Sequence, residues 1–156
     1  MHKLDSATNL GVYSCCMSGI STEMTHAAGI FEVKLEPQAP DVQAGGEALS
    51  RMLLDKQFHG GLEATSKGTM LSASTSVKGS AGYVAMELVT GDLHGRAGTF
   101  VLQHNGVMTR GVPELNITVV PDSGTGQLVG LNGQMSINID GGKHSYDFEY
   151  VFAEAP

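Results

Sequence analysis

Residues 56–106 read KQFHGGLEATSKGTMLSASTSVKGSAGYVAMELVTGDLHGRAGTFVLQHNG, and this stretch decides the fold. Runs rich in Val, Leu, Thr and Ser alternate along it with short glycine-containing segments such as His59-Gly60-Gly61 and Lys78–Gly82. Glycine supplies the positive φ angles that tight turns require. The pattern predicts consecutive β-hairpins, but it indicates no chemistry by itself.

The rest of the chain extends this pattern to eight strands. Residues Ile30–Glu36 alternate between apolar and charged side chains, which is the period of a half-buried strand. No segment shows a convincing helical period. The predicted strands are residues 30–36, 50–58, 62–74, 83–90, 99–108, 115–120, 127–140 and 144–152. Between them we predict a polar loop over 37–48, a turn region over 91–98 and a bulge or bend at Asn105-Gly106.

Eight sequential strands joined by hairpins favour an all-β, up-and-down antiparallel barrel in one domain. Closure of a barrel removes the exposed strand edges on which open sheets aggregate. The 156 residues suit a single domain. An eight-stranded barrel has an interior that side chains can fill or that can hold one small ligand.

Composition limits the partners and the compartment. Nine Lys and Arg against 16 Asp and Glu give a net charge of −7, and an acidic surface disfavours binding to nucleic acid. No stretch approaches the roughly 20 apolar residues that span a bilayer, so we expect no membrane partner. The neighbouring Cys15 and Cys16 suit free thiols in a reducing compartment, which predicts a cytoplasmic protein.

The first 23 residues differ from the rest of the chain. They show no period of a strand or a helix, and they lack the basic and apolar regions of a secretory signal. We expect an N-terminal extension that is flexible or packed on a partner, followed by a barrel domain over residues 24–156. An alternative is that translation starts at Met24, where strand-like sequence follows directly.

Four motifs resemble a family of small bacterial proteins of unknown function. The resemblance runs from about Thr25 to Val151. The motifs are Lys56-x-Phe58-x-Gly60-x-Leu62-x-x-x-Ser66-x-Gly68-x-Met70-Leu71, Gly82-Tyr83-x-Ala85-x-Glu87, Gly95-Arg96-x-Gly98-x-Phe100-x-Leu102-x-His104-x-Gly106 and Pro121–Gly126. The family's fold is similar to the allene oxide cyclase barrel. The resemblance implies an eight-stranded barrel and a homodimer, and it implies no activity.

Polar residues stand in predicted strand rows that are otherwise apolar. Tyr83 and Glu87 share one face of the fourth strand, His104 lies in the fifth, and Tyr146 lies in the eighth. If these rows face inward, the four side chains form a polar cluster in an apolar cup. The alternatives are a hydrogen-bonded network that fixes the strand register, a small-ligand pocket, a proton-transfer site at Glu87 or His104, or an exposed position.

Lys56 lies on the same face as Leu54 and Phe58 in the second strand. An inward lysine could hold a ligand carboxylate or form a Schiff base. The alternative is that it snorkels at the rim of the barrel.

Other motifs carry little chemistry. Asp122-Ser123-Gly124 occurs once, whereas aspartic proteases need two such carboxylates. Ala64–Gly68 nearly matches a nucleophile elbow, but no helix follows its serine, Ser66. The six histidines are scattered, and we predict no metal site and no cofactor.

The function predicted from these residues is the binding of a small apolar or amphipathic molecule inside the barrel. Two alternatives stay open. One is an isomerase-like or cyclase-like enzyme acting inside the barrel, and the other is a structural or interaction dimer with a filled barrel.

Overall fold

The computed structural model describes residues 23–39, 42–44 and 47–153 and shows a closed antiparallel β-barrel. Its eight long strands are β1 (Thr25–Pro37), β3 (Glu47–Gly60), β4 (Leu62–Ser74), β5 (Ala81–Leu93), β6 (Arg96–Thr109), β7 (Val112–Val119), β8 (Leu131–Asp140) and β9 (Lys143–Phe152). A short strand, β2 (Val42–Ala44), and one turn of 3₁₀ helix, η1 (Gly126–Leu128), complete the described elements. Within these residues no helix has the length and apolarity needed to cross a membrane.

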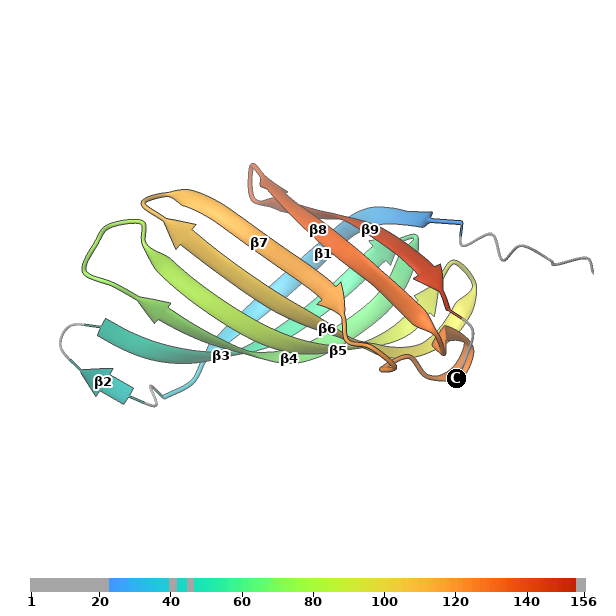
Figure 1. Ribbon diagram of the computed structural model, residues 1–156, viewed down its shortest axis with the longest axis horizontal. Helices are drawn as coiled ribbons and strands as arrows, with labels where there is room; N and C mark the ends of the chain where they lie inside the picture. Colours follow the sequence, from blue (N-terminus) through green and yellow to red (C-terminus); the bar gives the residue numbers. More distant parts are fainter. Residues whose placement is uncertain (1–22, 40–41, 45–46, 154–156) are drawn as a thin grey trace, which may run out of the picture.

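The strands follow an up-and-down order, as the sequence predicts. From β3 to β9 each strand pairs with its neighbour in the chain, and β1 lies between β9 and β3. The β1–β3 ladder runs from Gly29 opposite Gly60 to Pro37 opposite Met52, and it closes the barrel (Figure 1). The eight-stranded antiparallel barrel is therefore confirmed.

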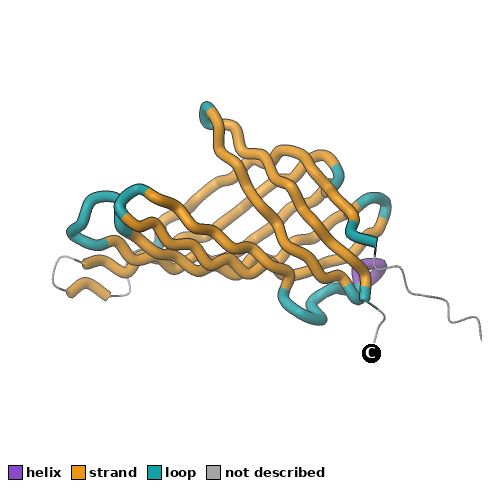
Figure 2. Tube along the Cα trace, turned by 45° about the horizontal axis from the view of Figure 1, so that its top comes forward, coloured by secondary structure: helices purple, strands orange, loops and turns teal. Residues whose placement is uncertain are grey.

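One seam of the barrel is short. Strands β7 and β8 pair only through Ile117 with Met135 and Thr118 with Gln134, whereas β6 and β7 pair through eight positions. Beyond these two pairs the strands diverge, and both ribbon views show the β8–β9 hairpin bending away from the β6–β7 hairpin (Figures 1 and 2). The barrel is consequently wider at this end, which we call the open end.

The turns differ from the sequence prediction in three places. The predicted loop 37–48 contains β2 and the start of β3. In the predicted turn region 91–98 only His94 and Gly95 leave the strands, because both adopt positive φ and Asp92 accepts a hydrogen bond from the Gly95 amide. The seventh predicted strand begins at Leu131 rather than at 127, because η1 occupies its first residues.

Large apolar side chains fill the closed end. The side chains of Phe58, Phe100 and Phe148 are almost fully buried, and the rings of Phe100 and Phe148 stack with centroids 5.8 Å apart. Close packing of this kind leaves no room for a ligand at the closed end. Any internal site must therefore lie toward the open end.

Gly106 belongs to a regular ladder instead of the predicted bulge. It pairs with Tyr83, and Asn105 pairs with Val84, without an extra residue. A Cβ atom at position 106 would overlap the Tyr83 ring, which lies directly over the glycine. The glycine is thus a place where an aromatic ring covers the backbone of the neighbouring strand.

We expect Gly106→Ala to lower the free energy of unfolding by about 1–3 kcal/mol, because the new methyl group must displace the Tyr83 ring. Urea denaturation measures the change. Gly82→Ala is the matched control, since a Cβ there meets its nearest atom at 3.7 Å. In a Tyr83→Ala background the cost of Gly106→Ala should fall, and an unchanged cost would contradict this account.

Candidate functional site

Glu87 is the centre of a buried polar cluster. Alternation along β5 turns Ala85, Glu87 and Val89 into the barrel, and Glu87 has no exposed surface. Its Oε2 atom lies 2.8 Å from the Lys56 Nζ atom and 2.8 Å from the His104 Nε2 atom. Its Oε1 atom accepts a hydrogen bond from the Ser66 hydroxyl. We call these four residues the Glu87 cluster.

The cluster joins four consecutive strands across the interior. Lys56 comes from β3, Ser66 from β4, Glu87 from β5 and His104 from β6. Lys56 lies opposite Ser66 in the β3–β4 ladder, and His104 lies opposite Ala85 in the β5–β6 ladder. The registers of the β3–β4, β4–β5 and β5–β6 ladders bring one inward side chain from each of the four strands to the same part of the interior, and the four side chains meet there.

Lys56 is buried instead of snorkelling at the rim. Only 7% of the residue is exposed, and its ammonium group lies 5.2 Å from the centre of the Phe31 ring and 5.6 Å from that of Phe58. The faces of aromatic rings attract cations, so the two rings support the charge that Glu87 neutralises.

The charge of Glu87 is stabilised by its partners. Burial alone would raise the pKa of the carboxyl group, but the hydrogen bond from His104, the charge and hydrogen bond of Lys56 and the hydrogen bond from Ser66 lower its pKa to about 2. Glu87 is consequently ionised at neutral pH. A carboxylate with so low a pKa is a weak proton acceptor.

An apolar cavity of about 570 Å³ lies at the open end of the barrel. Its lining includes Met70, Tyr83, Met108, Leu115, Ile137 and Ile139. Leu115 on β7 and Ile137 on β8 face each other across the region where these two strands are no longer paired. The short seam therefore opens the cavity to the side of the barrel as well as to its end.

Tyr83 connects this cavity to the Glu87 cluster. It lines the cavity and lies two inward positions before Glu87 on β5. Burial raises the pKa of its phenol, and the negative charge of Glu87 raises it further. Both effects favour the neutral phenol, which is the usual form at neutral pH, and its hydroxyl group can donate a hydrogen bond. Lys56, Glu87 and His104 lie deeper and are not part of the cavity lining.

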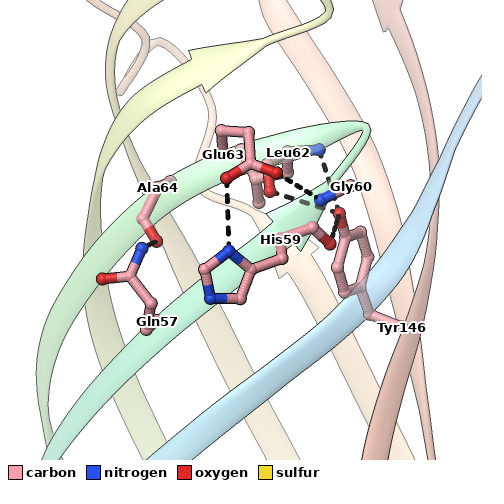
Figure 3. Close-up of polar contacts among 7 residues, drawn as sticks. All are labelled: Gln57, His59, Gly60, Leu62, Glu63, Ala64 and Tyr146. Atoms are coloured by element: carbon pink, nitrogen blue, oxygen red, sulfur yellow. Dashed lines mark hydrogen bonds and ion pairs between the residues drawn. The ribbon is translucent and has the colours of Figure 1, made fainter.

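Tyr146, the remaining predicted site residue, lies at the closed end. Its hydroxyl group accepts a hydrogen bond of 2.9 Å from the Leu62 amide and lies 3.2 Å from the carbonyl oxygen of His59 (Figure 3). It fastens the turn between β3 and β4 instead of joining the Glu87 cluster. The structure therefore brings together Lys56, Glu87 and His104, places Tyr83 beside them, and separates Tyr146.

Ser66 is the member of the cluster that the sequence analysis did not include. It was considered there only as a nucleophile. The sequence feature that could have indicated its position is its place in the inward row Leu62, Ala64, Ser66, next to the strand that carries Glu87.

Among the described residues no three His, Cys, Asp or Glu side chains are grouped to hold a metal ion. Cys15 and Cys16, like nearly all of the expected N-terminal extension, lie outside the described residues.

The low pKa of Glu87 predicts a pH-dependent loss of stability. A carboxyl group whose pKa falls on folding stabilises the protein above its unfolded pKa, about 4.5, and loses this effect as the pH falls toward 2. The difference between the unfolded and folded pKa of Glu87 corresponds to about 3 kcal/mol of unfolding free energy. We expect the difference in unfolding free energy between the wild type and Glu87→Gln to shrink by about this amount between these two pH values.

Denaturant unfolding at a series of pH values measures this difference. At neutral pH Glu87→Gln should be destabilised by roughly 3–5 kcal/mol, because it leaves the Lys56 charge buried without its counter-ion. Glu114→Gln, which changes an exposed carboxylate on β7, is the control and should have little effect. A difference that is constant from neutral pH to pH 2 would show that Glu87 is not the titrating group.

Comparisons with known proteins agree with the resemblance seen in the sequence. A family model described as "Protein of unknown function (DUF3224)" matches residues 27–150. A crystal structure of a protein of unknown function from this family in Shewanella oneidensis MR-1 is 55% identical to the chain. The match covers 84% of this chain and 99% of that one, with a TM-score of 0.81. No curated protein is significantly similar to the chain.

Neither match says anything of allene oxide cyclases, so that likeness stays a prediction. The family model covers most of the barrel, from β1 to β9. The chain therefore belongs to the DUF3224 family of proteins of unknown function.

Proposed function

We propose that the barrel binds a small, partly apolar molecule in the cavity at its open end. The observation that carries this proposal is the cavity itself, about 570 Å³ with a predominantly apolar lining. Small-molecule sites are typically concave, mostly apolar and 300–1,000 Å³ in volume, with a few polar groups that orient the ligand. The volume and the mostly apolar lining fit this description, and Tyr83, Ser72, Glu114 and Asn138 are its polar side chains.

The apolar lining supports an apolar part of the ligand. Ile139 is 61% exposed, Met108 is 41% exposed and Leu115 is 40% exposed, although all three belong to inward rows. Covering such side chains with an apolar ligand removes their surface from water, and each Å² removed is worth roughly 25 cal/mol. Methionine also adapts to ligands of different shape, because its side chain is flexible.

Tyr83 supports a polar part of the ligand that accepts a hydrogen bond. A phenol is protonated at neutral pH, and burial and the Glu87 charge, which raise its pKa, favour the same form. A ligand oxygen placed near the hydroxyl group would therefore receive a hydrogen bond.

Proton-transfer catalysis at the Glu87 cluster has less support. Glu87 is fully buried, is already bonded to Lys56, Ser66 and His104, and has a pKa of about 2. An enzyme that uses a carboxylate as a base commonly raises its pKa toward the working pH. The proposal is therefore binding, with the Glu87 cluster as the support of the site.

The binding proposal is tested with the fluorescent probe 1-anilinonaphthalene-8-sulfonate, which combines an apolar ring system with an acceptor group. We expect the wild type to bind it and Leu115→Trp to raise the Kd at least about tenfold, because the larger side chain fills the cavity. Val112→Trp adds the same side chain to β7 at a residue that does not line the cavity, and it should bind like the wild type.

Tyr83→Phe tests the polar contact separately. It should raise the Kd about fivefold, since loss of one hydrogen bond is worth about 1 kcal/mol, and leave the fold intact. Native mass spectrometry of freshly purified protein would identify any co-purified ligand by an extra mass that is lost on denaturation. Equal affinity of Leu115→Trp, Val112→Trp and the wild type would overturn the proposal that the cavity is the binding site.

A further inference from the structure

One side of the barrel is uncharged over most of its area, and the charged residue next to it is Lys67 on β4, which lies opposite Leu88. The outward positions of β4, β5 and β6 alternate with the interior rows described above. We define the uncharged face as the outward residues Thr69, Leu71, Ala73, Gly82, Val84, Met86, Leu88, Thr90, Thr99, Val101, Gln103, Asn105 and Val107. None of these positions is Asp, Glu, Lys or Arg.

The centre of the uncharged face is apolar and exposed. Val84 is 52% exposed, Met86 is 53% exposed and Leu88 is 50% exposed on β5, with Leu71 beside them on β4. Leu53 on β3 adjoins this group through Thr69. Contiguous apolar surface of this kind marks interaction sites in soluble proteins, whereas single exposed apolar residues are ordinary.

The opposite side of the barrel is acidic. Strand β9 lies across the barrel from β5, since three strands separate the two in each direction around the closed sheet. Its outward row contains Lys143, Asp147 and Glu149, and the outward row of the neighbouring β1 contains Glu32, Lys34 and Glu36, so carboxylates outnumber lysines on this side. Charge is therefore segregated around the barrel wall.

We propose that two copies of this chain associate through the uncharged face. Each copy has a net charge of −7, so approach through the acidic side would place carboxylates against carboxylates. The uncharged face is the side on which two copies meet without this repulsion. A contact between identical faces is closed by a two-fold axis, which is the commonest symmetry of soluble oligomers.

The composition of the face suits the apolar core of such a contact, and its outline of roughly 400 Å² is about half of what one partner buries in a standard interface. From Gly82 to Thr90 it extends roughly 27 Å along β5, and three strands with their spacing make it roughly 15 Å wide. An interface of standard size buries about 800 Å² on each partner and has an apolar core with a polar rim. The apolar residues supply the core, and Gln103, Asn105 and the Lys67–Asp55 ion pair, 2.7 Å long, supply the rim.

The surface relief of the face also fits a partner side chain. A shallow hollow of about 270 Å³ is lined by residues that include Leu71, Val84, Met86 and Gln103. A second hollow of about 370 Å³ adjoins it at the edge of the face. It is lined by Leu53 and Thr69 together with the charged residues Lys34, Glu36, Asp55 and Lys67. Gly82 and Val107 belong both to this face and to the lining of the cavity at the open end, so the contact would border the cavity, and the test of the dimer is made without added ligand.

The test is the oligomeric state of the full chain in solution, measured by native mass spectrometry and by size-exclusion chromatography with light scattering over a dilution series. We expect the wild type to be a dimer. Val84→Glu combined with Met86→Glu should weaken dimerisation by roughly 100-fold or more, because four carboxylates would be buried together at the two-fold contact.

Ile30→Glu is the matched control, because Ile30 is 58% exposed on the outward row of β1 and lies outside the uncharged face. It should leave the dimer unchanged, and circular dichroism should show that both variants remain folded. A monomeric wild type would overturn the proposal. So would a dimer that persists in the double variant or that is weakened equally by Ile30→Glu, since the contact would then lie elsewhere.

Discussion

The carboxylate of Glu87, buried without contact with water, is the constraint on which the middle of the barrel depends. A charge moved from water into a protein interior loses several kcal/mol of solvation, and only close partners recover it. Lys56, Ser66 and His104 are those partners, and each comes from a different strand. The strands β3, β4, β5 and β6 must therefore keep the registers that bring these four side chains together.

This requirement also explains why β5 has one definite register. A slip of one residue would turn Glu87 to the outside and bring Leu88 into the barrel, because side chains alternate along a strand. An all-apolar row would tolerate displacement by two residues more easily, since a similar side chain would take each place. The Glu87 cluster tolerates neither, because its hydrogen bonds depend on the position of particular atoms. Buried polar groups act here as determinants of register, which was one of the alternatives that the sequence left open.

The sequence predicted the strands well, because period-2 alternation is a local property. Alternation also put Glu87, His104 and Lys56 in largely apolar rows, but it left open whether these side chains face inward, outward or, for Lys56, the rim; the structure buries all three. It could not place Tyr146, whose hydroxyl group reaches the β3–β4 turn, because this contact joins residues 84 positions apart. Nor could it show the short β7–β8 seam, since the number of paired residues depends on how the last strands curve to close the barrel.

The Glu87 cluster divides the interior into two parts with different roles. On one side large aromatic and aliphatic residues fill the closed end, where Tyr146 fastens a turn. On the other side the ladder between β7 and β8 is interrupted, and half-exposed apolar residues surround a cavity. An interrupted ladder weakens the barrel wall at the open end, because the backbone groups facing the gap lack a strand partner. The buried ion pair and its hydrogen bonds hold the neighbouring strands β3 to β6 in place beside this gap. A barrel held in this way can keep one end open for a ligand without losing the register of its strands.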